Sequence, residues 1–168
     1  MKMDDIKQGL SSLWDSVADG WQHVRQSATN SLTDFRPGEQ TNLPIRNTVD
    51  DTFYMPTLGW SMLGGDLYED DTRVIVRLEI PGLTKEHLDI SVDGDTLVVR
   101  GEKQFSREDS EGRYRVIQCA YGNFRRTFPL NVPVLAELAK ASYENGVLRV
   151  ELPKAKVTKP QIHTVKIN

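Results

Sequence analysis

The sequence predicts an all-β protein whose central domain is an immunoglobulin-like, antiparallel β-sandwich. From residue 66 onward, apolar and polar residues alternate in short runs, which is the period of half-buried strands. Turn residues separate the runs and no segment of helical period lies between them, which favours a sandwich. Of the 168 residues, we assign 1–62 to a partly helical N-terminal arm, 63–154 to the β domain and 155–168 to a flexible C-terminal extension.

In the first strands of the domain, apolar and polar residues alternate, and turn residues end each alternating run. Residues 73–80 alternate, and Pro81-Gly82 stops the run because proline has no N–H to donate to a neighbouring strand. Residues 88–92 alternate again, and Asp93-Gly94 supplies a hairpin turn into the apolar residues 97–99. The pattern therefore predicts three strands in this half of the domain.

A polar segment, residues 102–113, predicts a long exposed loop, and residues 114–117 and 124–130 follow as further strands. Cys119 alternates with Ile117 as on a strand, so we expect a buried or partly buried thiol.

The charge of Arg126 is unusual for its position. It lies between Phe124 and Phe128 on one face of a strand whose aromatic side chains should point inward. A charge buried there must be paired or must reach a boundary with another chain. An arginine at a strand end that extends its guanidinium to water is the alternative.

The most specific local signal is a hairpin near the end of the domain. Asn145-Gly146 is the dipeptide that a two-residue type I′ turn prefers, since both central residues need positive φ. Residues 147–152 then alternate, with Leu148, Val150 and Leu152 on one face, until Pro153 ends the pairing. We expect this strand to contribute one side of the core.

The N-terminal residues predict an amphipathic helix. Its apolar residues recur at spacings of three and four: Ile6, Leu10, Leu13, Trp14, Val17, Trp21, Val24, Ala28 and Leu32. Gly20 costs about 1 kcal/mol relative to alanine and could break the helix. The segment could dock on its own core or form an assembly and client-binding arm. A membrane-surface helix is disfavoured because its polar face is mixed in charge.

Residues 33–60 have no sustained period and are interrupted by prolines, which indicates a mobile connection. They also carry Phe35, Phe53, Tyr54 and Trp60, more aromatic residues than a simple linker needs.

Composition excludes several classes of function. The net charge of −3 gives no general attraction to nucleic acid or to anionic membranes, and no run approaches the ~18 apolar residues of a stable membrane span. The N-terminus does not resemble a signal peptide, and the single cysteine fits a reducing compartment, so we expect a cytoplasmic protein. The three histidines lie far apart in sequence and no phosphate loop or nucleophile elbow is present. We therefore expect no enzyme activity, no metal and no cofactor.

Five motifs in order resemble the small heat shock proteins of the bacterial and plant type, whose shared unit is the α-crystallin domain. They are Leu78-Glu79-Ile80-Pro81-Gly82-Leu83, Val99-Arg100-Gly101-Glu102-Lys103, Tyr121-Gly122-Asn123-Phe124-Arg125-Arg126-Thr127-Phe128, Ala141-Ser142-Tyr143-Glu144-Asn145-Gly146-Val147-Leu148 and Val165-Lys166-Ile167. Each motif alone is weak, whereas the ordered set is specific.

The resemblance implies an ATP-independent chaperone, or holdase, that forms homodimers and larger oligomers. It implies that the long loop presents a strand to the partner's sheet, so the expected dimer interface comprises Tyr114, Arg115, Val116, Ile117 and Arg126. It also implies that the tail anchor, Val165 and Ile167, docks into an edge groove of a neighbouring domain. The residues expected to line that groove are Leu88, Ile90, Val92, Ala141 and Tyr143.

The expected partners are therefore unfolding client proteins and further copies of the chain. The expected client-binding arm comprises Leu13, Trp14, Trp21, Phe35, Phe53, Tyr54 and Trp60. The alternative is a β-sandwich adaptor of the p23 type that binds one defined protein partner. The long loop and the tail anchor favour the chaperone, since an adaptor needs neither.

Overall fold

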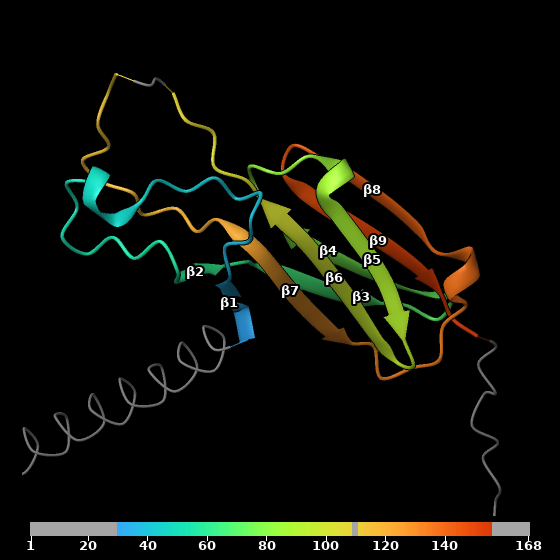
Figure 1. Cartoon of the computed structure of the whole chain (residues 1–168). Coiled ribbons are helices and arrows are strands. Elements are labelled where there is room, and N and C mark those ends of the chain that lie inside the picture. The colour runs from blue at the N-terminus through green and yellow to red at the C-terminus, as the bar shows by residue number, and fades with distance from the viewer. Residues whose placement is uncertain (1–29, 109–110, 156–168) are drawn as a thin grey trace, which may run out of the picture.

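The computed structural model describes residues 30–108 and 111–155 and consists of β-strands, with short 3₁₀ turns as its only complete helical elements there (Figure 1). The strands are β1 (Leu32–Phe35), β2 (Gly59–Met62), β3 (Gly65–Glu69), β4 (Arg73–Glu79), β5 (Leu88–Asp93), β6 (Thr96–Lys103), β7 (Gly122–Pro129), β8 (Lys140–Glu144) and β9 (Val147–Pro153). The 3₁₀ turns are η1 (Arg46–Thr48), η2 (Lys85–His87) and η3 (Ala136–Leu138). Within these residues, no helix is long and apolar enough to cross a membrane.

Two antiparallel sheets form the sandwich. One has the order β3-β4-β9-β8 and the other the order β5-β6-β7. Strands β1 and β2 form a separate two-stranded ribbon beside β7 (Figure 1). The predicted all-β sandwich is confirmed. The end strands of the two sheets are β3, β8, β5 and β7, and edge strands are where further backbone pairing is available.

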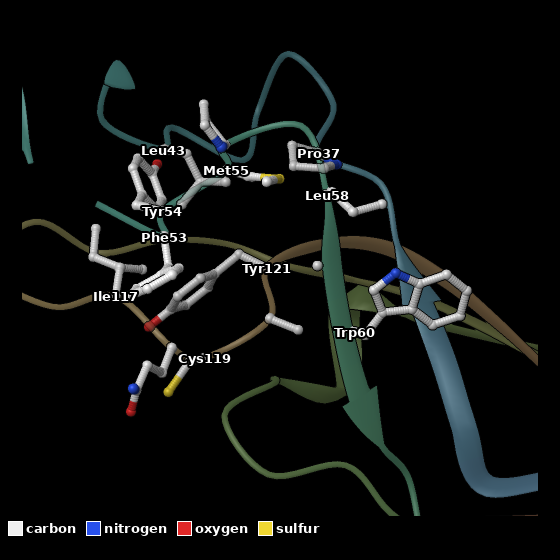
Figure 2. Close-up of a pocket in the computed structure, with 14 residues that line it drawn as sticks. Pro37, Leu43, Phe53, Tyr54, Met55, Leu58, Trp60, Ile117, Cys119 and Tyr121 are labelled. Carbon is white, nitrogen blue, oxygen red and sulfur yellow. The ribbon is translucent and has the colours of Figure 1, made fainter. Parts of the chain in front are cut away.

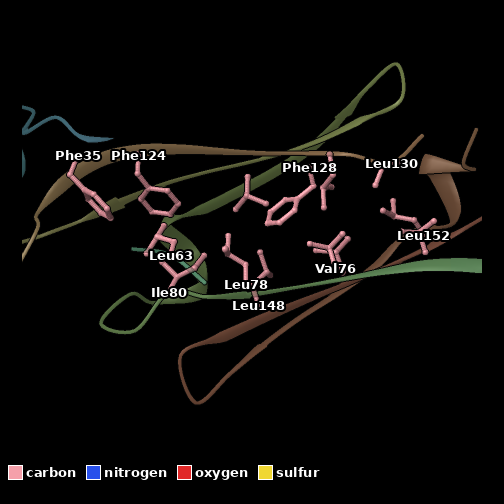
Figure 3. Packing of buried hydrophobic residues seen from close by; sticks show 14 of the residues in the cluster. Phe35, Leu63, Val76, Leu78, Ile80, Phe124, Phe128, Leu130, Leu148 and Leu152 are labelled. Atoms are coloured by element: carbon pink, nitrogen blue, oxygen red, sulfur yellow. The ribbon is translucent and has the colours of Figure 1, made fainter. Parts of the chain in front are cut away.

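The core lies between the two sheets and uses the predicted inward faces. Val74, Val76, Leu78 and Ile80 are buried against Leu148, Val150 and Leu152 from the adjoining strand. Phe124 and Phe128 of β7 cover them from the opposite sheet, as Figure 3 shows. Burying side chains of this size contributes about 1.5–3 kcal/mol each, so this cluster is the main favourable term for folding.

The predicted hairpin is present between β8 and β9. Asn145 has φ 52° and Gly146 has φ 79°, the two positive values that a type I′ turn requires. The turn also supports the core, because the carbonyl of Gly146 accepts a 2.8 Å hydrogen bond from the N–H of Ile80.

The segment before residue 63 differs from the prediction of a mobile connection. Its β1 strand pairs with β2, and the bridge between Arg36 and Asn123 fixes it to β7 with two 2.9 Å backbone hydrogen bonds. Phe35 thereby joins the core cluster. Alternation could not reveal this, because the partners of β1 lie far away along the chain. The division into arm, domain and tail stays a prediction, although one arm residue belongs to the core.

Candidate interaction surfaces

A large apolar surface lies at the end of the sandwich that carries β1 and β2. The ribbon face comprises Leu32, Trp60 and Met62, which share one side of the ribbon because Leu32 lies opposite Met62 in register and strand positions alternate. The adjoining pocket rim comprises Phe53, Met55 and Leu58. We call the two together the end surface. It holds six of the eleven exposed large apolar side chains of the described residues, so apolar exposure is concentrated there.

The pocket beside the ribbon has a volume of about 230 Å³. Figure 2 shows Phe53, Ile117 and Tyr121 gathered on one side of it and Trp60 on β2 on the other. Because Leu58 and Trp60 line this pocket as well as being exposed, the pocket and the ribbon face are continuous. Such a surface can take apolar side chains of varied shape, since aromatic and methionine side chains adapt to their partner.

Two residues of the expected client-binding arm are buried, although Tyr54 also lines the wall of the pocket. Phe35 is 1% exposed and packs on Phe124, with ring centroids 5.2 Å apart. Tyr54 is 4% exposed, and its hydroxyl donates a 2.7 Å hydrogen bond to the carbonyl of Pro44. Burial also raises the pKa of Tyr54. Tertiary packing removes both rings from solvent in this conformation, and their assignment as client contacts stays a prediction. Phe53, at 88% exposed, and Trp60 remain available.

The loop segment 114–117 is not a strand in the single chain, which corrects that prediction. Tyr114 instead forms a parallel bridge with the buried Val49, and its carbonyl accepts a 3.0 Å hydrogen bond from the N–H of Asp50. The Asp50 carboxylate also pairs with Arg113 at 2.6 Å. Beyond Tyr114 this segment forms no further ladder with the described residues. Val116 is consequently exposed.

Aromatic contacts hold the two ends of this loop together. Phe105 packs edge-on against Tyr114 and Tyr121, with ring centroids 5.1 Å apart in both pairs. Lys103 lies over the Tyr121 ring at 5.3 Å. Cys119 is exposed, contrary to the expected burial, because the segment that carries it is not a strand. Desolvation, together with the neighbouring Cys119, raises the pKa of Tyr121.

Arg126 is half-buried beside β1. Its guanidinium lies 5.2 Å from the centre of the Phe128 ring and donates from Nη1 to the carbonyl of Asn30, while Nε is buried without a hydrogen-bond partner among the described residues. Desolvation lowers the pKa of Arg126. The side chain is therefore neither fully paired nor free in water, and its place at a dimer boundary stays a prediction.

The residues expected to receive the tail anchor lie on two edge strands of different sheets. Leu88, Ile90 and Val92 of β5 are half-buried and pack on the core. On β8, Ala141 is exposed, whereas Tyr143 is half-buried and donates hydrogen bonds to the carbonyls of Ile80 at 2.7 Å and Leu83 at 3.3 Å. The structure thus places both groups at sheet edges.

The chain is similar in sequence and in fold to a known protein family. The model of the Hsp20/alpha crystallin family matches residues 66–168, more than half of the chain. The chain belongs to this family. Among solved Hsp20 structures, heat shock protein 16.0 from Schizosaccharomyces pombe has a TM-score of 0.52 at 33% identity, over 61% of this chain and 97% of that one. A small heat-shock protein from Xylella fastidiosa, at 24% identity and a TM-score of 0.51 over 64% of this chain and 98% of that one, supports the fold alone.

The curated Hsp20 relatives include class I heat shock proteins of plants. A 16.9 kDa class I heat shock protein of rice is 31% identical over 74% of this chain and 84% of its own length. One of wheat is 37% identical over 56% of this chain, which spans 63% of the wheat protein.

Some expected site residues lie outside the described part of the Hsp20 chain. They are Leu13, Trp14 and Trp21 of the arm and Val165 and Ile167 of the tail. Within residues 30–108 and 111–155, no three His, Cys, Asp or Glu side chains are placed to hold a metal ion.

Sequence reasoning also missed four members of the end surface: Leu32, Met55, Leu58 and Met62. The alternation of Trp60 and Met62 was the available signal for two exposed residues on one strand face.

Proposed function

We propose that this protein is an ATP-independent holdase that binds partly unfolded proteins on the end surface and keeps them from aggregating. The observation that carries the proposal is the concentration of exposed apolar side chains at this end of an Hsp20 domain. A contiguous apolar patch on a soluble domain marks an interaction site. Methionine and aromatic side chains suit clients that share hydrophobicity but no common shape. Leu13, Trp14 and Trp21 extend the client-binding arm beyond the described residues.

The assembly that we propose has two contacts. Residues 114–117 pair with the exposed edge strand β3 of a second copy and form the dimer, with Arg126 near the boundary. Val165 and Ile167 dock at the β5 and β8 edges of a neighbouring domain and join dimers into oligomers. Each buried aliphatic contributes about 1.5–3 kcal/mol, so single anchors exchange while many together hold the assembly.

The direct test measures light scattering of a heat-labile protein during heating, without ATP. We expect the full chain to suppress scattering in proportion to its molar ratio, and an equal mass of an inert globular protein to leave it unchanged. Scattering that is unaffected by the chain at equimolar amounts would refute the holdase. A strict monomer at all concentrations, together with tight binding of one partner, would instead favour the adaptor.

The client surface is tested by Trp60→Thr with Met62→Thr, since threonine keeps a high strand propensity and both side chains are exposed. Deletion of the whole arm is a poorer test, because it also removes Phe35 from the core. We expect the double variant to need several times more protein for equal protection, whereas Leu138→Thr, a control at η3, should protect as the parent does. Equal protection by both variants would place the client site elsewhere.

A further inference from the structure

The end surface lies where the undescribed N-terminal residues join the structure. Leu32, the first residue of β1, is both the last member of the predicted apolar stripe and a member of the ribbon face. The described part of the chain therefore begins at this surface. A helix over residues 6–28 would be about 35 Å long, whereas a four-residue strand spans only about 13 Å. The segment is long enough to cover the ribbon face and the pocket rim.

The chemistry of the two partners is complementary. The apolar stripe of residues 6–28 carries leucine, valine, isoleucine and two tryptophans at helical spacing, and the end surface presents exposed side chains of the same class. An amphipathic helix needs an apolar partner for its stripe, because propensity alone rarely stabilises a helix of this length in water.

Polar atoms at the same place lack partners among the described residues. Asp34 lies opposite Trp60 in the ribbon, and its Oδ2 accepts a 2.7 Å hydrogen bond from Arg36, but its buried Oδ1 accepts none. Arg126 Nε is likewise buried without an acceptor, although its Nη1 reaches the carbonyl of Asn30. Buried polar atoms are nearly always hydrogen-bonded. Residues 19–25, which include both Asp19 and Arg25, carry groups able to complete both sites.

We propose that the end surface is the docking site of the chain's own N-terminal segment, residues 6–28, whose apolar stripe covers Leu32, Trp60 and Met62 and whose polar residues pair with Asp34 and Arg126. The other occupants to distinguish are the ribbon of a second copy and a segment of a bound client. The inference goes beyond the proposed function, since it concerns how the chain covers this surface when no client is present.

Hydrogen exchange on the full-length protein without client tests the docking. We expect amides of residues 6–28 to be protected in the parent and to exchange at least about tenfold faster in Trp60→Thr with Met62→Thr, which removes the apolar receptor. Leu138→Thr is the matched control: Leu138 is 55% exposed, close to the 51% of Trp60 and 63% of Met62, but lies on η3. It should leave exchange unchanged. Unprotected amides in the parent, or equal protection in parent and double variant, would overturn the proposal.

A photo-reactive phenylalanine analogue placed at Met62 identifies the occupant directly. We expect cross-links to residues 6–28 of the same copy, which mixed isotope-labelled copies distinguish from cross-links between copies. Cross-links to residues 6–28 of a neighbouring copy alone would overturn docking of the chain's own segment. Cross-links to the ribbon of a second copy, or to an added client alone, would overturn it. These readouts do not use chaperone activity, so failure of the docking and failure of the holdase remain distinguishable.

Discussion

At the scale of single residues, two side chains of the same chemical type differ in burial and therefore in role. Phe35 and Phe53 both belong to the aromatic segment before the sandwich. Phe35 packs on Phe124 within the core, whereas Phe53 extends from the pocket rim into solvent. The first is therefore a structural residue, and the second is available for binding.

We predict that Phe35→Ala lowers the free energy of unfolding by about 3–5 kcal/mol, because it leaves a cavity beside Phe124. Phe53→Ala is the matched control and should change it by less than about 0.5 kcal/mol, as exposed substitutions usually do. Urea unfolding followed by circular dichroism measures both. Similar losses in the two variants would mean that Phe35 does not occupy the core.

Glu151 contributes a pH-dependent interaction on the outer face of the larger sheet. Its carboxylate accepts 2.9 Å hydrogen bonds from Arg73 and from Arg149. Both hydrogen bonds hold the pKa of Glu151 below its ordinary value, and the one from Arg73 has the larger effect. Because the pKa of Glu151 is lower in the folded state, its ion pairs stabilise the fold at pH values above the pKa of an unfolded glutamate, about 4.3. This stabilisation is lost as the pH falls through the pKa of the folded state.

We therefore predict that Glu151→Gln lowers the unfolding temperature at pH 7, and that its difference from the parent shrinks as pH falls below about 4. The effect at pH 7 should be modest, since solvent and salt screen these side chains. Calorimetry across this pH range measures it, with Glu137→Gln on η3 as control. A difference that stays constant from pH 7 to pH 3 would show that the ion pairs are not its cause.

At the scale of elements, backbone pairing remains incomplete at β3. All five residues of β3 are exposed and the strand forms one edge of its sheet. Residues 114–117 carry a strand-like sequence, but their one β-bridge to another described residue is that from Tyr114 to Val49. An open edge and an unused strand-like segment are complementary, and this supports pairing between two copies.

We predict that Val116→Asp weakens dimer formation by at least about tenfold, because pairing at β3 would bury a charge without a partner. The fold of the single chain should be unchanged, since Val116 is exposed in it. Sedimentation over a concentration series measures the dissociation constant, with Ser106→Asp in the same loop as control. Equal weakening by both substitutions would point to loop charge in general, and no weakening would remove residues 114–117 from the interface.

At the scale of the whole molecule, the sandwich folds around its own core while its edges and apolar end are left for other contacts. The aliphatic residues of β5 are half-buried and pack on the core, so an anchor that docks there would complete existing packing. Val165 and Ile167 have the spacing of such an anchor, one residue apart after a polar tether.

We predict that Val165→Ala with Ile167→Ala reduces large oligomers to folded dimers, because each anchor loses its buried apolar area while the core is untouched. Gln161→Ala in the tether is the control and should leave the oligomer intact. Light scattering coupled to size exclusion gives the masses, and circular dichroism checks the fold. Large oligomers that persist in the double variant would show that the tail does not join dimers.

The sequence by itself determined the local structure of the sandwich. Alternation located the strands of the core, and Asn145-Gly146 specified its turn, because side-chain direction and positive φ depend on near neighbours. The ordered motifs also predicted the family, whose model matches residues 66–168. These features need no knowledge of distant contacts.

Only the tertiary structure decided which residues of the arm and the loop are buried. The β1–β2 ribbon exists because Arg36 pairs with Asn123 and Phe35 packs on Phe124, contacts between segments far apart in sequence. A two-stranded ribbon is marginal alone, so its formation depends on the surface it packs against. The same reason explains the exposed Cys119 and the missing strand at 114–117: a strand-like sequence becomes a strand only where a second strand is within hydrogen-bonding reach.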